Sequence, residues 1–118
     1  MKVSGFTFIR NGINLGYPFI ESIKSILPIC DEFIIAVGKS EDNTLQKICA
    51  LKSKKIKIIE TSWNENISDR GFVYAQQKMI AQYNCTGDWA FYLEGDEILD
   101  SKDHKKLLIE LQNHLNNK

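Results

Sequence analysis

Apolar positions along the chain follow two alternating patterns. Four segments are rich in β-branched and aromatic residues and are short enough to be buried strands. Between them, apolar residues recur every three or four positions, as on the buried side of an amphipathic helix. The pattern predicts strands over 3–9, 33–37, 56–60 and 89–93, and helices over 17–30, 42–53, 70–84 and 101–116.

The strict alternation of strands and helices predicts the fold class. Near-continuous apolar strands joined by amphipathic helices are typical of a Rossmann-like, three-layer α/β/α fold with a mainly parallel sheet and right-handed crossovers. A chain of 118 residues has the length of one such domain, which would cover 1–118. In this class, ligands bind outside the carboxyl ends of the strands, so the loops that follow the strands are the place to look for a site.

Polar and charged residues follow each predicted strand. The four loops read RNG at 10–12, GKSEDNT at 38–44, TSWNEN at 61–66 and EGDE at 94–97. Asp, Asn, Ser and Gly are turn formers, so an ordinary turn explains the second loop as well as a binding site does. In a parallel sheet, however, all four loops meet at one edge, and we expect their polar groups to converge there.

The fourth loop places three carboxylates directly after an apolar strand. Glu94, Asp96 and Glu97 repel one another, and beside buried residues they lose part of their hydration. A divalent cation would compensate for both effects, and Mg²⁺ or Mn²⁺ suits oxygen ligands from carboxylates and substrate phosphates. The alternative is an acidic turn in which Asp96 or Asp100 caps the last helix.

Composition argues against several classes of protein. The 15 basic residues balance 15 acidic ones, which leaves no net field to attract nucleic acid. No apolar run approaches the ~20 residues that cross a bilayer, and no cleavage-site pattern follows the N-terminal apolar stretch. We therefore expect a cytoplasmic protein, with peripheral attachment to a membrane as the alternative. The three cysteines lack the spacing of a zinc site or a disulfide framework, so we expect buried or half-buried free thiols.

Known motifs for other nucleotide chemistry are missing. The sequence has no P-loop, no G-x-G-x-x-G after the first strand, no G-x-S-x-G and no H-E-x-x-H. It does contain an S-x-D-x-T loop after the second strand, SEDNT, and the segment GDWAFYLEGDE, which matches a G-D-W…D-x-D-E pattern except at one position. In this order, these motifs resemble the N-terminal, nucleotide-binding half of family 2 glycosyltransferases with the GT-A fold, and the resemblance covers nearly the whole chain.

The resemblance implies a function. It implies inverting transfer of a sugar from a nucleotide-diphosphate sugar, preferably a UDP-sugar, to an acceptor that could be a saccharide, a lipid or a protein. It also implies that Mn²⁺ or Mg²⁺ bridges the diphosphate to the protein. The resemblance further implies a truncated, single GT-A-like domain that lacks most of the acceptor-binding half, where the family carries its catalytic base.

The resemblance also assigns residues. Asp96 matches the second Asp of the D-x-D motif and would be the metal ligand, while Glu94, at the first position, would contact the ribose or reach the metal through water. Asp42 would lie near the nucleotide base. The other nucleotide-sugar-binding positions are the end of the first strand with Phe8, Arg10 and Asn11, then Gly38, Gly95 between the two carboxylates, and Lys78, near the donor phosphates.

The sequence departs from the family at several of these positions. Val37, Gly38 and Lys39 stand where the family commonly has a pair of Asp residues, Glu94 replaces an Asp, and Lys78 replaces an Arg and could simply be a solvated helix residue. Two alternatives follow: a nucleotide-sugar-binding module without independent catalysis, and an interaction domain that retains only the fold. An exposed sheet edge would also favour a homo-oligomer.

Overall fold

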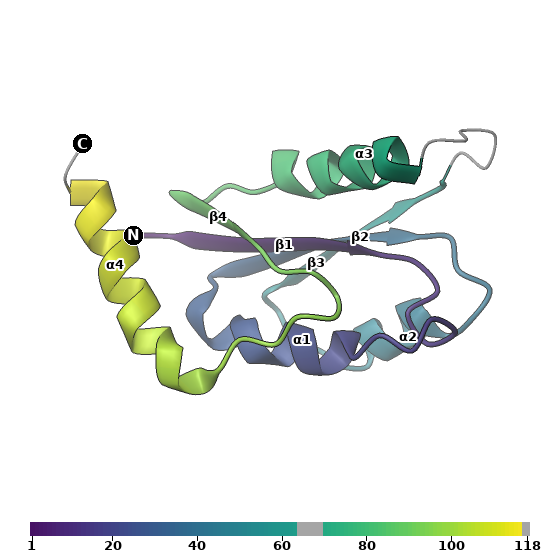
Figure 1. The fold of residues 1–118 in the computed structure, drawn as a ribbon, viewed down its shortest axis with the longest axis horizontal. Coiled ribbons are helices and arrows are strands. Elements are labelled where there is room, and N and C mark those ends of the chain that lie inside the picture. Colours follow the sequence, from purple (N-terminus) through teal and green to yellow (C-terminus); the bar gives the residue numbers. More distant parts are fainter. Residues whose placement is uncertain (64–69, 117–118) are drawn as a thin grey trace.

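The protein folds into three layers around one parallel sheet. The computed structural model describes residues 1–63 and 70–116. Its sheet contains four strands in the order β3-β2-β1-β4, all parallel to their neighbours (Figure 1). The strands are β1 (Val3–Ile9), β2 (Glu32–Gly38), β3 (Ile56–Thr61) and β4 (Trp89–Tyr92). The predicted α/β class and parallel sheet are confirmed.

The strand order reverses at β1. Strands β1, β2 and β3 are added in one direction, and the chain then crosses back so that β4 pairs with the other side of β1, with Phe6 opposite both Ile34 of β2 and Tyr92 of β4. Because crossovers are right-handed, this reversal sends the connecting helix to the opposite face of the sheet. The carboxyl ends of β1 and β4 therefore form a topological switch point, where crevices open in such folds.

The helices cover the two faces unequally. Figure 1 shows α1 (Phe19–Ile26) and α2 (Thr44–Cys49) on one face and α3 (Arg70–Tyr83) on the other. The last helix, α4 (His104–Asn116), lies at the end of the sheet that carries the N-terminus. Short 3₁₀ turns at Leu27–Ile29 and Ser101–Asp103 extend α1 and precede α4.

The second helix is shorter than the predicted 42–53. It starts only at Thr44, because the Asp42 side chain accepts a hydrogen bond from the Thr44 backbone N–H at 3.0 Å. Beyond its end at Cys49, Lys52 has a left-handed backbone with φ of 51°, which does not continue a right-handed helix. The sequence pattern therefore identified the element but overestimated its length.

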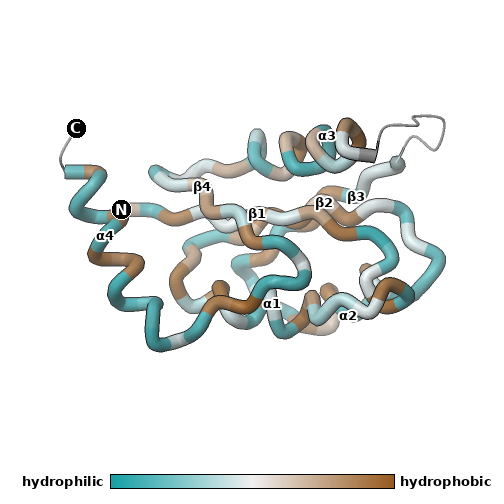
Figure 2. The backbone as a smooth tube through the Cα atoms, viewed as in Figure 1, coloured by the Kyte–Doolittle hydropathy of each residue, from teal (hydrophilic) through white to brown (hydrophobic). Residues whose placement is uncertain are grey.

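Two apolar clusters hold the layers together. All residues of β2 are buried, as expected for a strand covered on both faces. The larger cluster lies between the sheet and α1, includes Phe33, Ile26 and Ile48, and receives leucines from α4. The smaller one, with Phe6 and Ala81, lies under α3. Figure 2 shows hydrophobic segments along the strands and hydrophilic ones in the loops and along much of α4.

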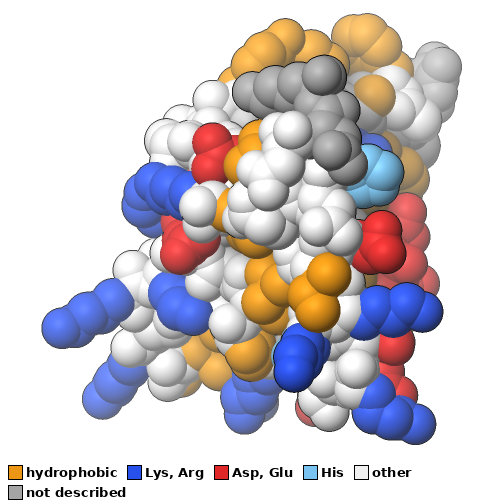
Figure 3. Space-filling view, turned by 90° about the vertical axis from the view of Figure 1, so that its left-hand side faces the viewer, with side chains coloured by type: hydrophobic (Ala, Val, Ile, Leu, Met, Phe, Trp, Pro, Cys, Tyr) orange, Lys and Arg blue, Asp and Glu red, His pale blue; other side chains and the backbone are white. Residues whose placement is uncertain are grey.

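Surface features bear on the expected partners. The face at the α4 end carries both basic and acidic side chains (Figure 3). Within the described residues, no helix has the length and apolar character needed to cross a membrane. Strands β3 and β4 form the two edges of the sheet, and a homo-oligomer through an edge stays a prediction.

The cysteines follow the expectation in part. All three are free, Cys30 is buried and Cys85 is half-buried, and burial raises the pKa of their thiols to about 12 and about 11. The prediction was wrong for Cys49, which is exposed, because it ends α2 on the side that faces solvent.

A buried carboxylate clamps the amino ends of the strands. Glu32, at the start of β2, is 2% exposed. Its oxygens accept hydrogen bonds from Ser4 Oγ of β1, from Lys57 Nζ of β3 at 2.8 Å, and from the backbone N–H and hydroxyl of Thr86 at 2.7 and 2.9 Å. Burial alone would raise the pKa of Glu32, but these donors outweigh it and lower the pKa to about 2.

We expect this carboxylate to make stability depend on acid. The folded pKa of Glu32 lies below its ordinary value of 4.5, so its contribution is complete above about pH 5 and is lost as the pH falls toward 2. The shift corresponds to about 3 kcal/mol at pH 7. In urea unfolding, Glu32→Gln should lose about this amount at pH 7, and the difference from wild type should shrink by more than half at pH 3.

The matched control is Glu60→Gln, which changes an exposed glutamate on β3. It should unfold within about 0.5 kcal/mol of wild type at both pH values. A deficit of Glu32→Gln that is equal at pH 7 and pH 3 would contradict the assigned ionised network.

Candidate functional site

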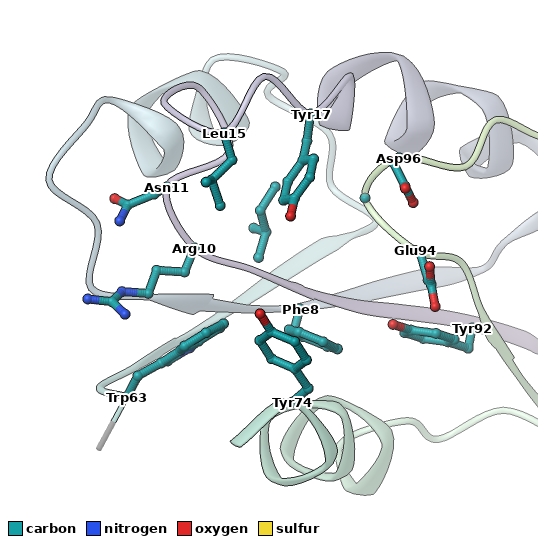
Figure 4. A pocket seen from close by; sticks show the side chains of 12 residues that line it. Phe8, Arg10, Asn11, Leu15, Tyr17, Trp63, Tyr74, Tyr92, Glu94 and Asp96 are labelled. Carbon is teal, nitrogen blue, oxygen red and sulfur yellow. The ribbon is translucent and has the colours of Figure 1, made fainter. Parts of the chain in front are cut away.

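A cavity opens at the switch point between β1 and β4. It has a volume of about 440 Å³ and is bordered by the loops that follow β1, β3 and β4 and by one side chain of α3 (Figure 4). This is the position at which parallel α/β sheets bind ligands. The lining residues are Phe8, Ile9, Arg10, Asn11, Leu15, Tyr17, Trp63, Tyr74, Tyr92, Glu94, Gly95 and Asp96.

Six of the nine residues assigned from the sequence lie together in this cavity. They come from two segments far apart in the chain, which the pairing of β1 with β4 brings side by side. Their individual roles in binding stay predictions. The six are Phe8, Arg10, Asn11, Glu94, Gly95 and Asp96.

The carboxylates at the β4 end of the cavity differ in what they contact. Glu97 closes the turn, because its side chain accepts a hydrogen bond from the Glu94 backbone N–H at 2.9 Å. Asp100 caps the following 3₁₀ turn by accepting from the Lys102 N–H. The acidic-turn alternative therefore describes Glu97 and Asp100. Among the described residues, the side chains of Glu94 and Asp96 have no hydrogen-bond or ion-pair partner, and both are exposed.

These carboxylates act on the nearby tyrosine. Tyr92 is half-buried, and burial together with the negative charges of Glu94, Glu97 and Asp96 raises the pKa of its hydroxyl to about 12. Tyr92 therefore stays protonated and can donate a hydrogen bond to a ligand at any physiological pH.

The described residues contain no ready-made cage for a metal ion. No group of three or more His, Cys, Asp or Glu side chains is arranged to hold one in the ranges 1–63 and 70–116. A cation at Asp96 would therefore need ligand oxygens from elsewhere, and substrate phosphates commonly supply them to Mg²⁺. The metal role of Asp96 stays a prediction.

The opposite end of the cavity is built by the loop after β1. Asn11 adopts a left-handed backbone with φ of 53°, a conformation that Asn tolerates better than most residues. Its backbone N–H donates to Ser40 Oγ at 3.0 Å, and its side-chain oxygen accepts from the Glu41 N–H at 2.8 Å. Asn11 thus fastens the loop after β1 to the loop after β2.

Asp42 lies outside the cavity lining. It borders a neighbouring hollow of about 370 Å³ together with Gly38. Burial raises its pKa, but hydrogen bonds from Thr44 and from the backbone N–H of Asn14, at 2.9 Å, outweigh this effect and lower it. The carboxylate is thus engaged in joining two loops, and contact with a nucleotide base stays a prediction.

Lys78 lies beside the cavity rather than in its lining. Its ammonium group is 4.1 Å from the centre of the Tyr92 ring, which does line the cavity. A lysine above an aromatic ring gains roughly 0.5–1 kcal/mol at an exposed site. The position near the donor phosphates that the resemblance assigns to Lys78 stays a prediction.

Of the aromatic side chains that line the cavity, the sequence analysis assigned Phe8 but not Tyr17, Tyr74 or Tyr92. Trp63, Tyr74 and Tyr92 pack around Phe8, with ring centres 6.3, 5.8 and 6.4 Å from it. Tyr17 lies across the cavity from Tyr74 (Figure 4). Tyr74 is 46% exposed on the second turn of α3. The sequence signal that could have pointed to it is an aromatic residue near the start of a predicted helix that follows one of the site loops. Residues 64–66 of the loop after β3 lie outside the described part of the chain.

The fold resembles that of a glycosyltransferase. The sequence matches no family model and no curated protein. Among solved structures, it is similar to S. aureus TarS 1–349, with a TM-score of 0.70, 18% identity and coverage of 97% of this chain. It is also similar to TarS 1–349 in complex with UDP, with a TM-score of 0.74 and 18% identity over 97% of this chain, and to S. aureus TarS, with a TM-score of 0.61 and 19% identity over 93%.

This likeness concerns only part of TarS. The chain spans 33% of the TarS 1–349 structures and 20% of the third structure. At such identities the comparison establishes the fold. The four-stranded sheet and its flanking helices resemble the part of TarS that the comparison covers.

Proposed function

We propose that the chain binds a nucleotide-diphosphate sugar, preferably a UDP-sugar, in the cavity between β1 and β4, as the donor-binding part of a family 2-like glycosyltransferase. The observation that carries this proposal is the pair of carboxylates, Glu94 and Asp96, that face the switch-point cavity without other partners in the described chain. The likeness to TarS, including a structure with UDP, supports it.

Asp96 would hold Mn²⁺ or Mg²⁺, with Glu94 reaching the ion through water. Both are hard oxygen ligands and suit these cations. When bound, the ion neutralises negative charge on the diphosphate leaving group. Lys78 is the cationic side chain that would assist near the phosphates, since its ammonium group stacks on the ring of Tyr92, which lines the cavity. Arg10 stacks on Trp63 at the other end of the cavity, where it would line the base pocket.

The remaining lining residues would orient the donor. Phe8, Tyr74 and Trp63 offer aromatic faces for planar rings or for the apolar face of a sugar, and Tyr92 keeps a hydroxyl proton to donate. Transfer with inversion to a saccharide, lipid or protein acceptor completes the proposal. Acceptor binding and the catalytic base are assigned to no described residue, because the chain spans a third of the TarS 1–349 structures.

A second candidate is a donor-binding module that does not transfer sugar by itself. The observation that favours it is the same coverage of one third, since binding requires only the cavity between β1 and β4. Under the third candidate, an interaction domain, neither metal-dependent binding nor transfer would occur. Binding and turnover measurements separate the three.

We expect UDP with Mn²⁺ to raise the thermal unfolding temperature of the chain. At a free ligand concentration of about 100 times the dissociation constant, the gain is roughly 2.7 kcal/mol, or on the order of 10 °C for a domain of this size. Asp96→Asn removes the metal-binding charge while keeping the shape, so the shift should disappear. Asp103→Asn, which changes an exposed Asp in the 3₁₀ turn before α4, is the matched control and should keep the shift. Equal shifts in wild type and Asp96→Asn would contradict the metal role.

Measurement of turnover distinguishes an active transferase from a module that only binds the donor. With UDP-glucose or UDP-N-acetylglucosamine and Mn²⁺, an active chain should release UDP, and Asp96→Asn should lower that rate at least tenfold because the leaving group loses its counter-charge. Liquid-chromatographic detection of UDP gives the rate. Tight binding of the sugar nucleotide without UDP release, with or without a panel of saccharide acceptors, would favour the module.

A further inference from the structure

Gly38, the last residue of β2, lies against the indole of Trp63. A Cβ atom at position 38 would be 2.5 Å from Trp63 Nε1, 2.8 Å from its Cδ1 and 3.1 Å from Arg10 Cβ. Real Cβ atoms essentially never approach other heavy atoms within 3.0 Å. By contrast, a Cβ atom at Gly95, which lines the cavity, would meet its nearest neighbour at an ordinary 3.6 Å.

The backbone of Gly38 does not require glycine. Within the described chain, Gly16 is the glycine with a positive φ, so Gly38 has a conformation open to residues with side chains. What excludes a side chain is the space that the indole occupies. Glycine at this position therefore has a packing reason that concerns Trp63.

Trp63 contacts three other residues that line one end of the cavity. Its ring lies 6.3 Å from Phe8 and 5.5 Å from Tyr74, edge to face, and the guanidinium of Arg10 stacks 5.2 Å from its centre. All four residues line the cavity. A shift of the indole would therefore move the wall at this end and change the surroundings of Arg10.

Hydrogen bonding does not hold the indole in place. In the described part of the chain, Trp63 Nε1 is buried without a hydrogen-bond partner, whereas the other tryptophan, Trp89, donates from Nε1 to the Leu111 carbonyl at 3.2 Å. An unpaired buried donor costs free energy, so the position of Trp63 depends on ring packing and on the space above Gly38.

We propose that Trp63 is the specificity-determining wall at the Arg10 end of the cavity and that Gly38 is its positioning residue. This inference rests on the proposed function. With Glu94 and Asp96 at the end that faces the diphosphate, the Trp63 end receives the nucleobase. The size of the base that fits is then set by how closely the indole approaches Gly38.

Fluorescence quenching tests the positioning. The chain contains two tryptophans, so in the Trp89→Phe variant Trp63 is the only one that remains. Adding Gly38→Ala should at least double its acrylamide quenching constant, because the methyl group displaces the half-buried indole and exposes its buried Nε1 edge. In the matched background, Trp63→Phe, the quenching of Trp89 should not change with Gly38→Ala. Unchanged quenching of Trp63 would overturn the proposal.

A double-mutant cycle covers the case in which Gly38→Ala fails to fold. Trp63→Ala removes the two atoms that the new methyl group would meet within 3.0 Å and leaves the less severe contact with Arg10 Cβ at 3.1 Å, so Gly38→Ala combined with Trp63→Ala should fold and behave like Trp63→Ala alone. A double variant that remains unfolded, or effects that simply add, would overturn the coupling between the two residues.

Base selectivity tests the wall. Titration of UDP and GDP with Mn²⁺ should show wild type preferring UDP. Trp63→Ala should lower that preference at least fivefold because it removes the indole, and Gly38→Ala should change it at least fivefold because it moves the indole. In the Trp63→Ala background, Gly38→Ala should have no further effect. An unchanged preference for UDP over GDP in both variants would overturn the proposal that Trp63 determines base selectivity. If wild type binds neither nucleotide, both the proposed function and the role of Trp63 in base selectivity are rejected. The quenching result still decides whether Gly38 positions Trp63.

Discussion

The pairing of β4 with the free side of β1 holds the two sides of the cavity together. Phe6 faces Tyr92 across this pairing, and from there the loop after β1 and the loop after β4 leave the sheet next to each other. Without this contact, Arg10 and Asp96 would belong to unrelated surface loops. The pairing in turn depends on the long return from β3 through α3, which covers the second face of the sheet through Val73 and Ala81.

The two ends of the sheet satisfy their polar groups in opposite ways. At the amino end, Glu32 is buried and surrounded by donors from three other segments, which locks the strands in register. At the carboxyl end, the exposed carboxylates of Glu94 and Asp96 have no partner among the described residues, and neither does the buried N–H of Trp63. Polar groups without protein partners are common where proteins bind ligands, so this contrast favours the carboxyl end of the sheet as the functional end.

The loops at this end are nonetheless organised. Asn11 and Asp42 join the loops after β1 and β2 through hydrogen bonds between side chains and backbone. The role that the resemblance gave to Asp42, near a base, thus competes with a structural role in the same residue. Aromatic packing around Phe8 adds a second, apolar support. A cavity held on both sides in this way is suited to bind a ligand without large rearrangement.

The sequence by itself determined the identity and order of the elements, the parallel α/β class and the acidic loop after the fourth strand. These are local properties, since the period of apolar residues depends on neighbours a few positions away. Only the tertiary structure decided that Tyr74 and Trp63 join Phe8, that Asp42 lies in an adjoining hollow, and that Gly38 is needed for the approach of an indole. Such contacts depend on which strand pairs with which and on the space left between side chains, and no local pattern encodes either.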